Sequence, residues 1–384
     1  MSSLDILDRL IAFPTVSRTP NLALIDYVAD LLSENGIASE LVHDETGTKA
    51  NLHATVGPQG GRGVMLSGHS DVVPVEGQAW SLDPFVLKRQ DGKLYGRGTA
   101  DMKGFVACAI NAMIQASQRK LGSPLHLALS YDEEIGCIGV RRLLETLKTS
   151  ALRPLVCIVG EPTSMAVATG HKGKTALLAR CIGVEAHSAL APTALNALHL
   201  ACDFVGILRA KQAEIAESGQ GDLDYDVPYT TIHVGKLGGG VALNIVPNLC
   251  EVEFEIRNIA EDDPEAILAE IRATAAALVD PLRQRFPEAD IRIDVTNAYP
   301  GLDTPGGSEA VAFVKSLTGA NSTTKVAFGT EGGLFDRDLQ VPAVVCGPGS
   351  MAQGHKPDEF VAVEQIERCD AMLSALIDRL ESGL

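Results

Sequence analysis

The segment LSGHSDVVP contains two side chains with the types and spacing of a metal-binding pair. His69 and Asp71 follow the apolar run 64–66, and residues i and i+2 of an extended segment point to the same side. An imidazole can bind a metal ion through one ring nitrogen while a nearby carboxylate accepts the N–H of the other nitrogen. The pair therefore predicts a ligand, His69, with a supporting acid, Asp71. The alternative is an ordinary polar loop end.

Further acidic residues and a second histidine follow the ends of the other predicted strands. In open α/β sheets, ligands bind beyond the carboxyl ends of the strands. Each residue alone has a structural explanation, such as a helix cap for Asp101 or solvated loop positions for Glu133 and Glu134. Together they favour a single cleft that gathers Asp101, Asp132, Glu133, Glu134, Glu161 and His355 around the first pair.

Several carboxylates in one cleft cannot all stay ionised unless positive charge compensates them. Two divalent cations would supply that charge, and mixed imidazole and carboxylate ligands suit zinc, or cobalt, better than magnesium or calcium. Glu133 and Glu134 are adjacent, so in an extended segment they point to opposite sides. One of the two can then bind metal while the other acts as a general base toward the attacking water.

The composition is that of a globular protein with an acidic surface. The chain has 384 residues, of which 46% are hydrophobic and 21% charged, and this predicts two or three domains. A formal net charge of −17 would repel phosphate backbones and anionic lipids, so we expect neither nucleic acid nor a membrane as partner. The eight cysteines form no Cys-x-x-Cys, and the first residues lack the features of a secretory signal, which predicts buried thiols in a cytoplasmic protein.

The order of the apolar segments predicts an α/β domain that is interrupted by a smaller one. Apolar runs at 50–56, 63–67, 124–131 and 155–159, with helical patterns at 101–119 and 136–148 between the later ones, are typical of a mostly parallel sheet covered by helices. Between 174 and 296 the order strand, helix, strand, strand, helix, strand is that of a ferredoxin-like α+β unit. We therefore predict a catalytic domain formed by 1–172 and 299–384, with an inserted domain at 173–298.

Five segments, in this order, resemble the M20 family of dinuclear metallo-aminoacylases and peptidases. They are GHSDVVP (68–74), GRGTADMKG (96–104), DEEIG (132–136), GEPT (160–163) and HKPDEF (355–360). The resemblance covers essentially the whole chain, including the insertion. It implies a zinc-peptidase-like catalytic domain with an inserted lid and dimerisation domain, and hence a homodimer formed through the insert.

The resemblance also implies a role for each candidate side chain in the first domain. His69 and Glu161 would bind one metal ion, Glu134 and His355 the other, and Asp101 would bridge the two. Glu133 matches the general base of the family, and Asp71 matches the acid that supports the histidine ligand.

Three residues of the insert match the family's substrate-binding positions. His187 in EAHSALAPTALNA (185–197) would stabilise the oxyanion, in some members at the site of the partner subunit. Asn244 in GGGVALNIVP and Arg257 in EFEIR would bind the substrate carboxylate, which a planar guanidinium can hold through both oxygens. EFEIR has Glu255 where many relatives carry aspartate.

Within the family, FGTEGGLF (328–335) and CGPGSMAQGHKPDEF are most similar to acetylornithine deacetylases. They depart from the serine-rich segment of succinyl-diaminopimelate desuccinylases. The similarity implies hydrolysis of N2-acetyl-L-ornithine to L-ornithine and acetate, a step of arginine biosynthesis. Glu331 is a candidate for binding the side-chain ammonium of this substrate, or else an acid at a helix start.

Two alternatives of different classes stay open. One is another hydrolase of the family, such as a succinyl-diaminopimelate desuccinylase, a general N-acyl-amino-acid aminoacylase or a dipeptidase. The other is a non-catalytic ligand-binding protein of the same fold, which a missing ligand or base would favour, and none is missing. The chain contains neither Gly-x-Ser-x-Gly nor His-Glu-x-x-His, so neither a serine-hydrolase elbow nor a single-metal helix site is indicated.

Overall fold

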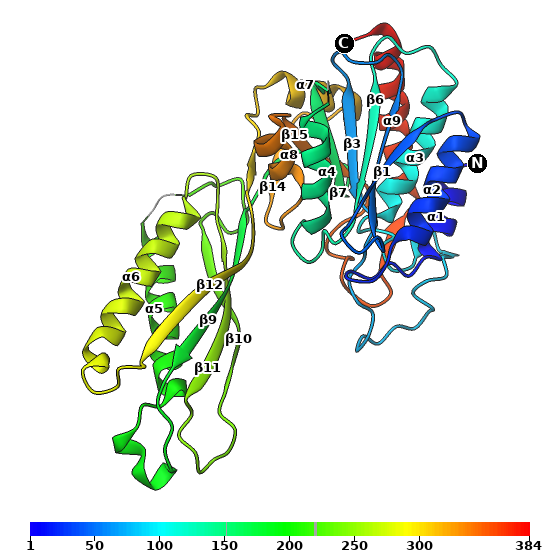
Figure 1. Cartoon of the computed structure of the whole chain (residues 1–384). Coiled ribbons are helices and arrows are strands. Elements are labelled where there is room, and N and C mark those ends of the chain that lie inside the picture. Colours follow the sequence, from blue (N-terminus) through cyan, green and yellow to red (C-terminus); the bar gives the residue numbers. More distant parts are fainter. Residues whose placement is uncertain (151, 219–220) are drawn as a thin grey trace. The chain divides into compact units, whose positions relative to one another are not determined.

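Two units make up the computed structural model, which describes residues 1–150, 152–218 and 221–384 (Figure 1). Unit 1 consists of Met1–His171 and Leu302–Leu384, and unit 2 of Lys172–Gly301. Unit 2 contains the range predicted for the inserted domain, 173–298, together with one residue before it and three after it. Each unit has its own hydrophobic core.

A mostly parallel sheet forms the centre of unit 1. Its described strands run in the order β1-β2-β6-β3-β7-β15-β8-β13, with β14 beside β8. The four middle strands, β6 (Leu125–Ser130), β3 (Val64–His69), β7 (Val156–Pro162) and β15 (Ala343–Gly347), are parallel to one another. The outer strands are β1 (Ser39–His43), β2 (Ala50–Val56), β8 (Ala168–His171), β13 (Leu302–Asp303) and β14 (Thr324–Val326). All residues of the four parallel strands are buried, as expected for strands covered on both faces.

Helices cover both faces of this sheet (Figure 1). One face carries α3 (Lys103–Ser117), packed against α1 (Ser3–Ile11), α2 (Leu22–Glu34) and α9 (Val363–Ser382), with α7 (Glu309–Thr318) beside α9. The other face carries α4 (Ile138–Lys148) and α8 (Gly332–Leu339). A Cβ atom at Gly160 would lie 1.9 Å from the ring of Phe105, so only glycine lets α3 pack directly on β7 next to Glu161.

Unit 2 is an antiparallel sheet with helices on one face. The strand order is β10-β11-β9-β12, where β9 is Lys174–Ile182, β10 Thr231–Gly239, β11 Leu249–Arg257 and β12 Asp290–Tyr299. Side chains of β11 alternate between buried and exposed, and the buried ones, such as Val252 and Phe254, pack against α5 (Ala197–Glu217) and α6 (Pro264–Arg283). This order and helix placement confirm the predicted ferredoxin-like α+β arrangement.

Several short elements had no clear signal in the sequence. They include α7, α8, the 3₁₀ helix η1 (Ser188–Thr193) and a small sheet of β4 (Lys88–Gln90), β5 (Lys93–Tyr95) and β16 (Phe360–Ala362). Of the eight cysteines, Cys202 is exposed and the others are buried, all as free thiols. Among the described helices, none combines the length and the apolar character needed to cross a membrane.

Candidate metal centre

The predicted ligands of unit 1 gather where the parallel strands end. β3 ends at His69, β6 is followed by Glu133 and Glu134, and β7 contains Glu161. These strands are neighbours and run in the same direction, so their carboxyl ends meet at one edge of the sheet. The loop after β15 brings His355 to the same group.

Asp101 lies between the two imidazoles. Its Oδ1 atom is 3.2 Å from Nε2 of His69, and its Oδ2 atom is 3.1 Å from Nε2 of His355. The residue occupies the turn just before α3 and is 3% exposed. One carboxylate oxygen thus faces each histidine, which is the arrangement expected of a ligand shared by two metal ions.

The remaining carboxylates divide between the two histidines. Nε2 of His355 lies 3.1 Å from Oε2 of Glu134, and Nε2 of His69 lies 3.6 Å from Oε1 of Glu161. Among the residues that the structure describes, two sets of donor atoms are close enough to hold an ion: His69 with Glu133 and Glu161, and His69 with Asp101 and Glu134. Adjacent Glu133 and Glu134 belong to different sets, and both sets contain His69.

Burial, neighbouring charges and hydrogen bonds shift the pKa values of these groups. Burial raises the pKa of Glu161 well above its usual range, and nearby Asp101 raises it further. Burial and the charge of Asp101 raise the pKa of Glu134 to about 7, against the opposing hydrogen bond of His355. Hydrogen bonds to Asp101 and Glu134 raise the pKa of His355 to about 10.

Two members of the cluster balance opposing effects. Burial favours protonated Asp101, but hydrogen bonds from His355 and His69 outweigh it and lower the pKa of Asp101 far below its usual value. Burial would lower the pKa of His69, yet its hydrogen bond to Asp101 and the charge of Glu161 raise it well above normal. The buried carboxylates of the cluster thus need compensating positive charge. Divalent cations bound there would replace the protons that the side chains otherwise hold. The donor set fits two metal ions on these grounds.

Asp71 supports His69 in a way that differs from the prediction. Nδ1 of His69 lies 2.9 Å from the main-chain oxygen of Asp71 and 3.6 Å from its carboxylate. The ring N–H of His69 therefore points to the main-chain carbonyl of Asp71, because the Asp71 carboxylate has other hydrogen-bond partners. It accepts the hydroxyl of Ser17 at 2.7 Å and the main-chain N–H groups of Glu133 at 3.0 Å and Glu134 at 3.4 Å. Asp71 thus orients both glutamates as well as the histidine.

Asp132 and Glu331 lie close to the cluster but have other partners. Asp132 forms an ion pair with Lys49, which explains why this acid does not join the other carboxylates. Glu331 is 2% exposed and accepts hydroxyl groups of Ser130 at 2.5 Å and Ser67 at 3.2 Å. It stands at the start of α8 but forms no side-chain cap, and burial raises its pKa to about 7.

In unit 2, His187 and Asn244 are neighbours. The main-chain N–H of Ser188 donates to the carbonyl of Asn244 at 2.9 Å, and His187 pairs with Ile245 in a β-bridge. Both residues are exposed. The N–H of Ala189 donates to Nδ1 of His187 at 3.2 Å, so a neutral ring carries its proton on Nε2 and can donate it.

Arg257 lies at the other end of the same sheet. It ends β11 and pairs with Thr231, whereas the 240–248 connection that carries Asn244 precedes the first residue of β11, Leu249. Eight residue steps along β11 correspond to about 26 Å at roughly 3.3 Å per residue. Within one chain, Arg257 and Asn244 therefore lie at opposite ends of β11.

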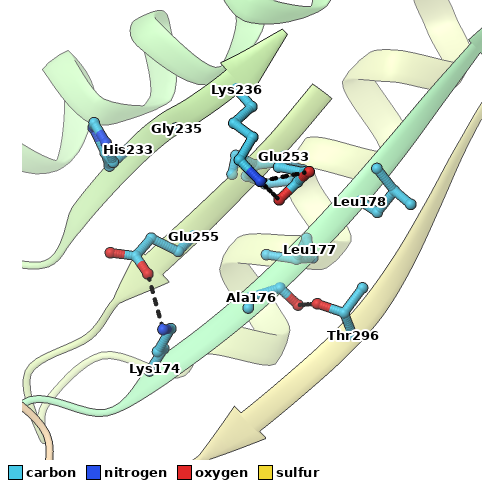
Figure 2. Close-up of a pocket in the computed structure, with 11 residues that line it drawn as sticks. Lys174, Ala176, Leu177, Leu178, His233, Gly235, Lys236, Glu253, Glu255 and Thr296 are labelled. Carbon is cyan, nitrogen blue, oxygen red and sulfur yellow. Dashed lines mark hydrogen bonds and ion pairs between the residues drawn. The ribbon is translucent and has the colours of Figure 1, made fainter. Parts of the chain in front are cut away.

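A hollow of about 500 Å³ lies on the open face of this sheet, and its charges are already paired (Figure 2). Lys174 lies 3.4 Å from Glu255, and Lys236 lies 3.3 Å from Glu253. Glu255 also accepts from Nε of Arg257 at 3.0 Å. Glu255 is thus shared between two cations, and one of them is Arg257, the predicted carboxylate-binding arginine.

Comparison with known proteins agrees with this geometry. The sequence profile of peptidase family M20/M25/M40 matches residues 65–379. The chain belongs to this family. It is 33% identical to an acetylornithine deacetylase from Pasteurella multocida (strain Pm70) over 389 residues, which cover 100% of this chain and 99% of that protein. The M20 chain is accordingly a metal-dependent hydrolase.

Solved structures share the fold at lower sequence identity. An M20 family metallo-carboxypeptidase from Sulfolobus solfataricus is 18% identical, with a TM-score of 0.79 and full coverage of both chains. A dinuclear metal-binding M20 peptidase from Bacillus subtilis is 14% identical, with a TM-score of 0.70, and the match covers 100% of this chain and 98% of that one. These likenesses confirm the fold class of the M20 chain.

Proposed function

We propose that the protein removes the acetyl group from N2-acetyl-L-ornithine, giving L-ornithine and acetate, a step of arginine biosynthesis. The observation that carries this proposal is the full-length similarity, at 33% identity, to an acetylornithine deacetylase. The cluster in unit 1 supports it because amide hydrolysis needs a polarised carbonyl and an activated water, and both tasks suit a metal centre.

The cofactors are two divalent metal ions, with zinc first and cobalt second. His69 and Glu161 would hold one ion, Glu134 and His355 the other, and Asp101 both, in agreement with the distances between these side chains. Bound there, the ions would supply Lewis acidity to the acetyl carbonyl and make water more acidic.

Glu133 is proposed as the general base. It is 8% exposed, and burial together with the charges of Glu134, Glu331 and Asp71 raises its pKa well above the usual carboxyl range, against the attraction of His69. A carboxylate with a raised pKa can take a proton from the attacking water and later pass it to the departing amine nitrogen. Its main chain is fixed by Asp71, which positions the base.

Substrate binding is proposed to need two copies of the chain. Arg257 of one copy would bind the α-carboxylate, while His187 and Asn244 would come from the other copy. The separation of about 26 Å along β11 supports this division, because acetylornithine is too small to bridge it. A homodimer formed through unit 2 would supply both groups to one site, and the Nε2–H of His187 would donate to the oxyanion.

A substrate panel tests the proposal. The zinc-loaded protein is assayed with N2-acetyl-L-ornithine, N-succinyl-L,L-diaminopimelate, other N-acetyl amino acids and a dipeptide, with release of the free amine as the readout. We expect the highest kcat/KM for acetylornithine. A higher value for the succinylated substrate, a general N-acetyl amino acid or the dipeptide would assign the protein to another branch of the family. No release from any of them would favour a non-catalytic protein.

A further inference from the structure

A buried acid outside the proposed ligand set holds the turn that carries Asp101. Oε1 of Glu359 accepts three main-chain N–H groups, from Gly98 at 3.1 Å, Ala100 at 2.9 Å and Asp101 itself at 3.1 Å. Glu359 is 1% exposed and lies four residues after His355. Three convergent donors on one oxygen leave this turn little freedom, so the place of the Asp101 backbone depends on Glu359.

An equally buried arginine completes this arrangement. Nη1 of Arg97 donates to Oε2 of Glu359 at 2.6 Å, and Arg97 is 0% exposed. Its Nη2 donates to Oε1 of Gln78 at 2.5 Å, and its guanidinium lies 4.9 Å from the ring centroid of Trp80. The planar guanidinium can reach both acceptors at once, which the single ammonium of a lysine could not do in this geometry.

The same chain of hydrogen bonds continues to His355. Nε2 of Gln78 donates to the main-chain carbonyl of His355 at 3.0 Å, and Nη1 of Arg97 lies 3.4 Å from the carbonyl of Lys356. The network Glu359-Arg97-Gln78 therefore connects the main chain of Asp101 with that of His355. Asp101 and His355 are two of the three side chains around one proposed metal ion, and the third is Glu134.

We propose that Glu359, Arg97 and Gln78 are positioning residues that fix the separation of Asp101 and His355, and so determine the affinity for the metal ion held between these two and Glu134. The inference rests on the proposed metal centre and adds residues that touch neither metal nor substrate. His69 and Glu161, which stand on strands β3 and β7, do not depend on the network. Asp101 is shared by both proposed ions, so loss of the network should weaken the binding of both, and most strongly that of the ion that also uses His355.

Calorimetric titration with Zn²⁺ of the chelator-treated protein tests this inference. We expect the wild type to bind two ions per chain. Glu359→Gln should bind the ion of His355, Glu134 and Asp101 about 10 to 100 times more weakly, the range typical for residues that orient metal ligands, with a smaller loss at the ion of His69 and Glu161. Gln78→Ala removes the link to His355 and one acceptor of Arg97 but leaves the bonds of Glu359 to the 98–101 turn, so it should show a smaller loss at the same ion.

Asn111→Ala is the matched control, because Asn111 also makes a buried hydrogen bond, to Ser3 on α1, away from the cluster. It should bind both ions as the wild type does, although its thermal stability falls. Two ions bound with unchanged affinity in Gln78→Ala and in folded Glu359→Gln would overturn the inference, as would an equal loss at both ions. If Glu359→Gln does not fold, Gln78→Ala decides alone. A wild type that binds no zinc would instead overturn the metal centre.

Discussion

At the scale of single residues, neighbours in the sequence have different tasks because their surroundings differ. Glu133 and Glu134 are adjacent, yet only Glu134 contacts His355, while Glu133 faces His69 and accepts the thiol of Cys137 at 3.3 Å. Asp132, one residue earlier, is neutralised by Lys49. The chemistry proposed for each acid follows from its partner rather than from its residue type.

The division of roles between the two glutamates predicts that Glu133→Gln lowers kcat strongly without releasing metal. The amide keeps the size of the side chain but cannot accept a proton, so kcat should fall by roughly 10²- to 10⁴-fold. Elemental analysis beside turnover checks this, with Glu161→Gln as the comparison that should lose metal. Loss of metal from Glu133→Gln to the same extent would show that Glu133 is a ligand.

Arg257 leads to a prediction about substrate recognition. Glu255 and the hydroxyl of Tyr299, at 3.0 and 3.2 Å, fix the orientation of its guanidinium. Arg257→Lys removes the planar pair of donors, so kcat/KM for acetylornithine should fall by about 10- to 100-fold, as for loss of a hydrogen bond to a charged group. A substrate with an amidated α-carboxylate is the control. Equal turnover of both substrates by the wild type would mean that Arg257 does not bind the carboxylate.

At the scale of elements, the sequence predicted best what rests on long apolar patterns. β3, β6, β7 and β15 were predictable because buried parallel strands are continuous apolar runs, and their ends then pointed to His69, Glu161 and the loop acids. The three-residue strands and α8 were not predictable, since so few residues show no period.

Contacts between residues far apart in the sequence could not be predicted either. The carboxylate of Glu359 meets the 98–101 turn across about 260 positions, and nothing in HKPDEF distinguishes this acid from an exposed one. The separation of Arg257 from Asn244 likewise depended on knowing the strand register. Polar residues in loops carry no periodic pattern from which such partners could be inferred.

The pairing of β2 with β6 yields a prediction about acid stability. It brings His53 and His126 together with ring centroids 6.0 Å apart, and the Nε2 atoms of both are buried without a hydrogen-bond partner. Burial lowers the pKa of each ring from 6.5 to about 4. Between pH 6.5 and 4 the unfolded chain therefore binds protons that the folded chain does not, so stability present above pH 6.5 is lost as the pH falls.

Replacing one ring should reduce this loss. In His53→Phe, the free energy of unfolding should decrease less between pH 7 and pH 5 than in the wild type, with a difference of up to about 2 kcal/mol. Urea unfolding at the two pH values measures it, and His43→Phe, which changes an exposed histidine, should behave as the wild type does. Identical pH dependence in wild type and His53→Phe would show that the buried ring is not the source.

At the scale of the whole molecule, the proposed active site uses groups from two chains. Arg257 and the pair His187–Asn244 stand at opposite ends of the sheet of unit 2, so a second copy must provide one of these groups if both bind the same small substrate. The order β10-β11-β9-β12 leaves β10 and β12 as edge strands of unit 2. Such an edge can pair with its symmetry copy in a two-fold dimer.

Mixing two inactive variants tests this requirement. Glu133→Gln and His187→Ala are combined under conditions that exchange subunits. If His187 acts in the partner's site, each mixed dimer has one complete site, and random exchange should restore about a quarter of the wild-type activity. A mixture that stays inactive despite proven exchange would place His187 in the site of its own chain, or outside catalysis.

The most direct test of the central claim is ornithine release from N2-acetyl-L-ornithine before and after metal removal. We expect that the zinc-loaded protein releases ornithine and acetate in equal amounts, that chelation abolishes this activity, and that added Zn²⁺ restores it. Zinc-loaded protein that releases no ornithine, or stripped protein that retains full activity, would contradict the account.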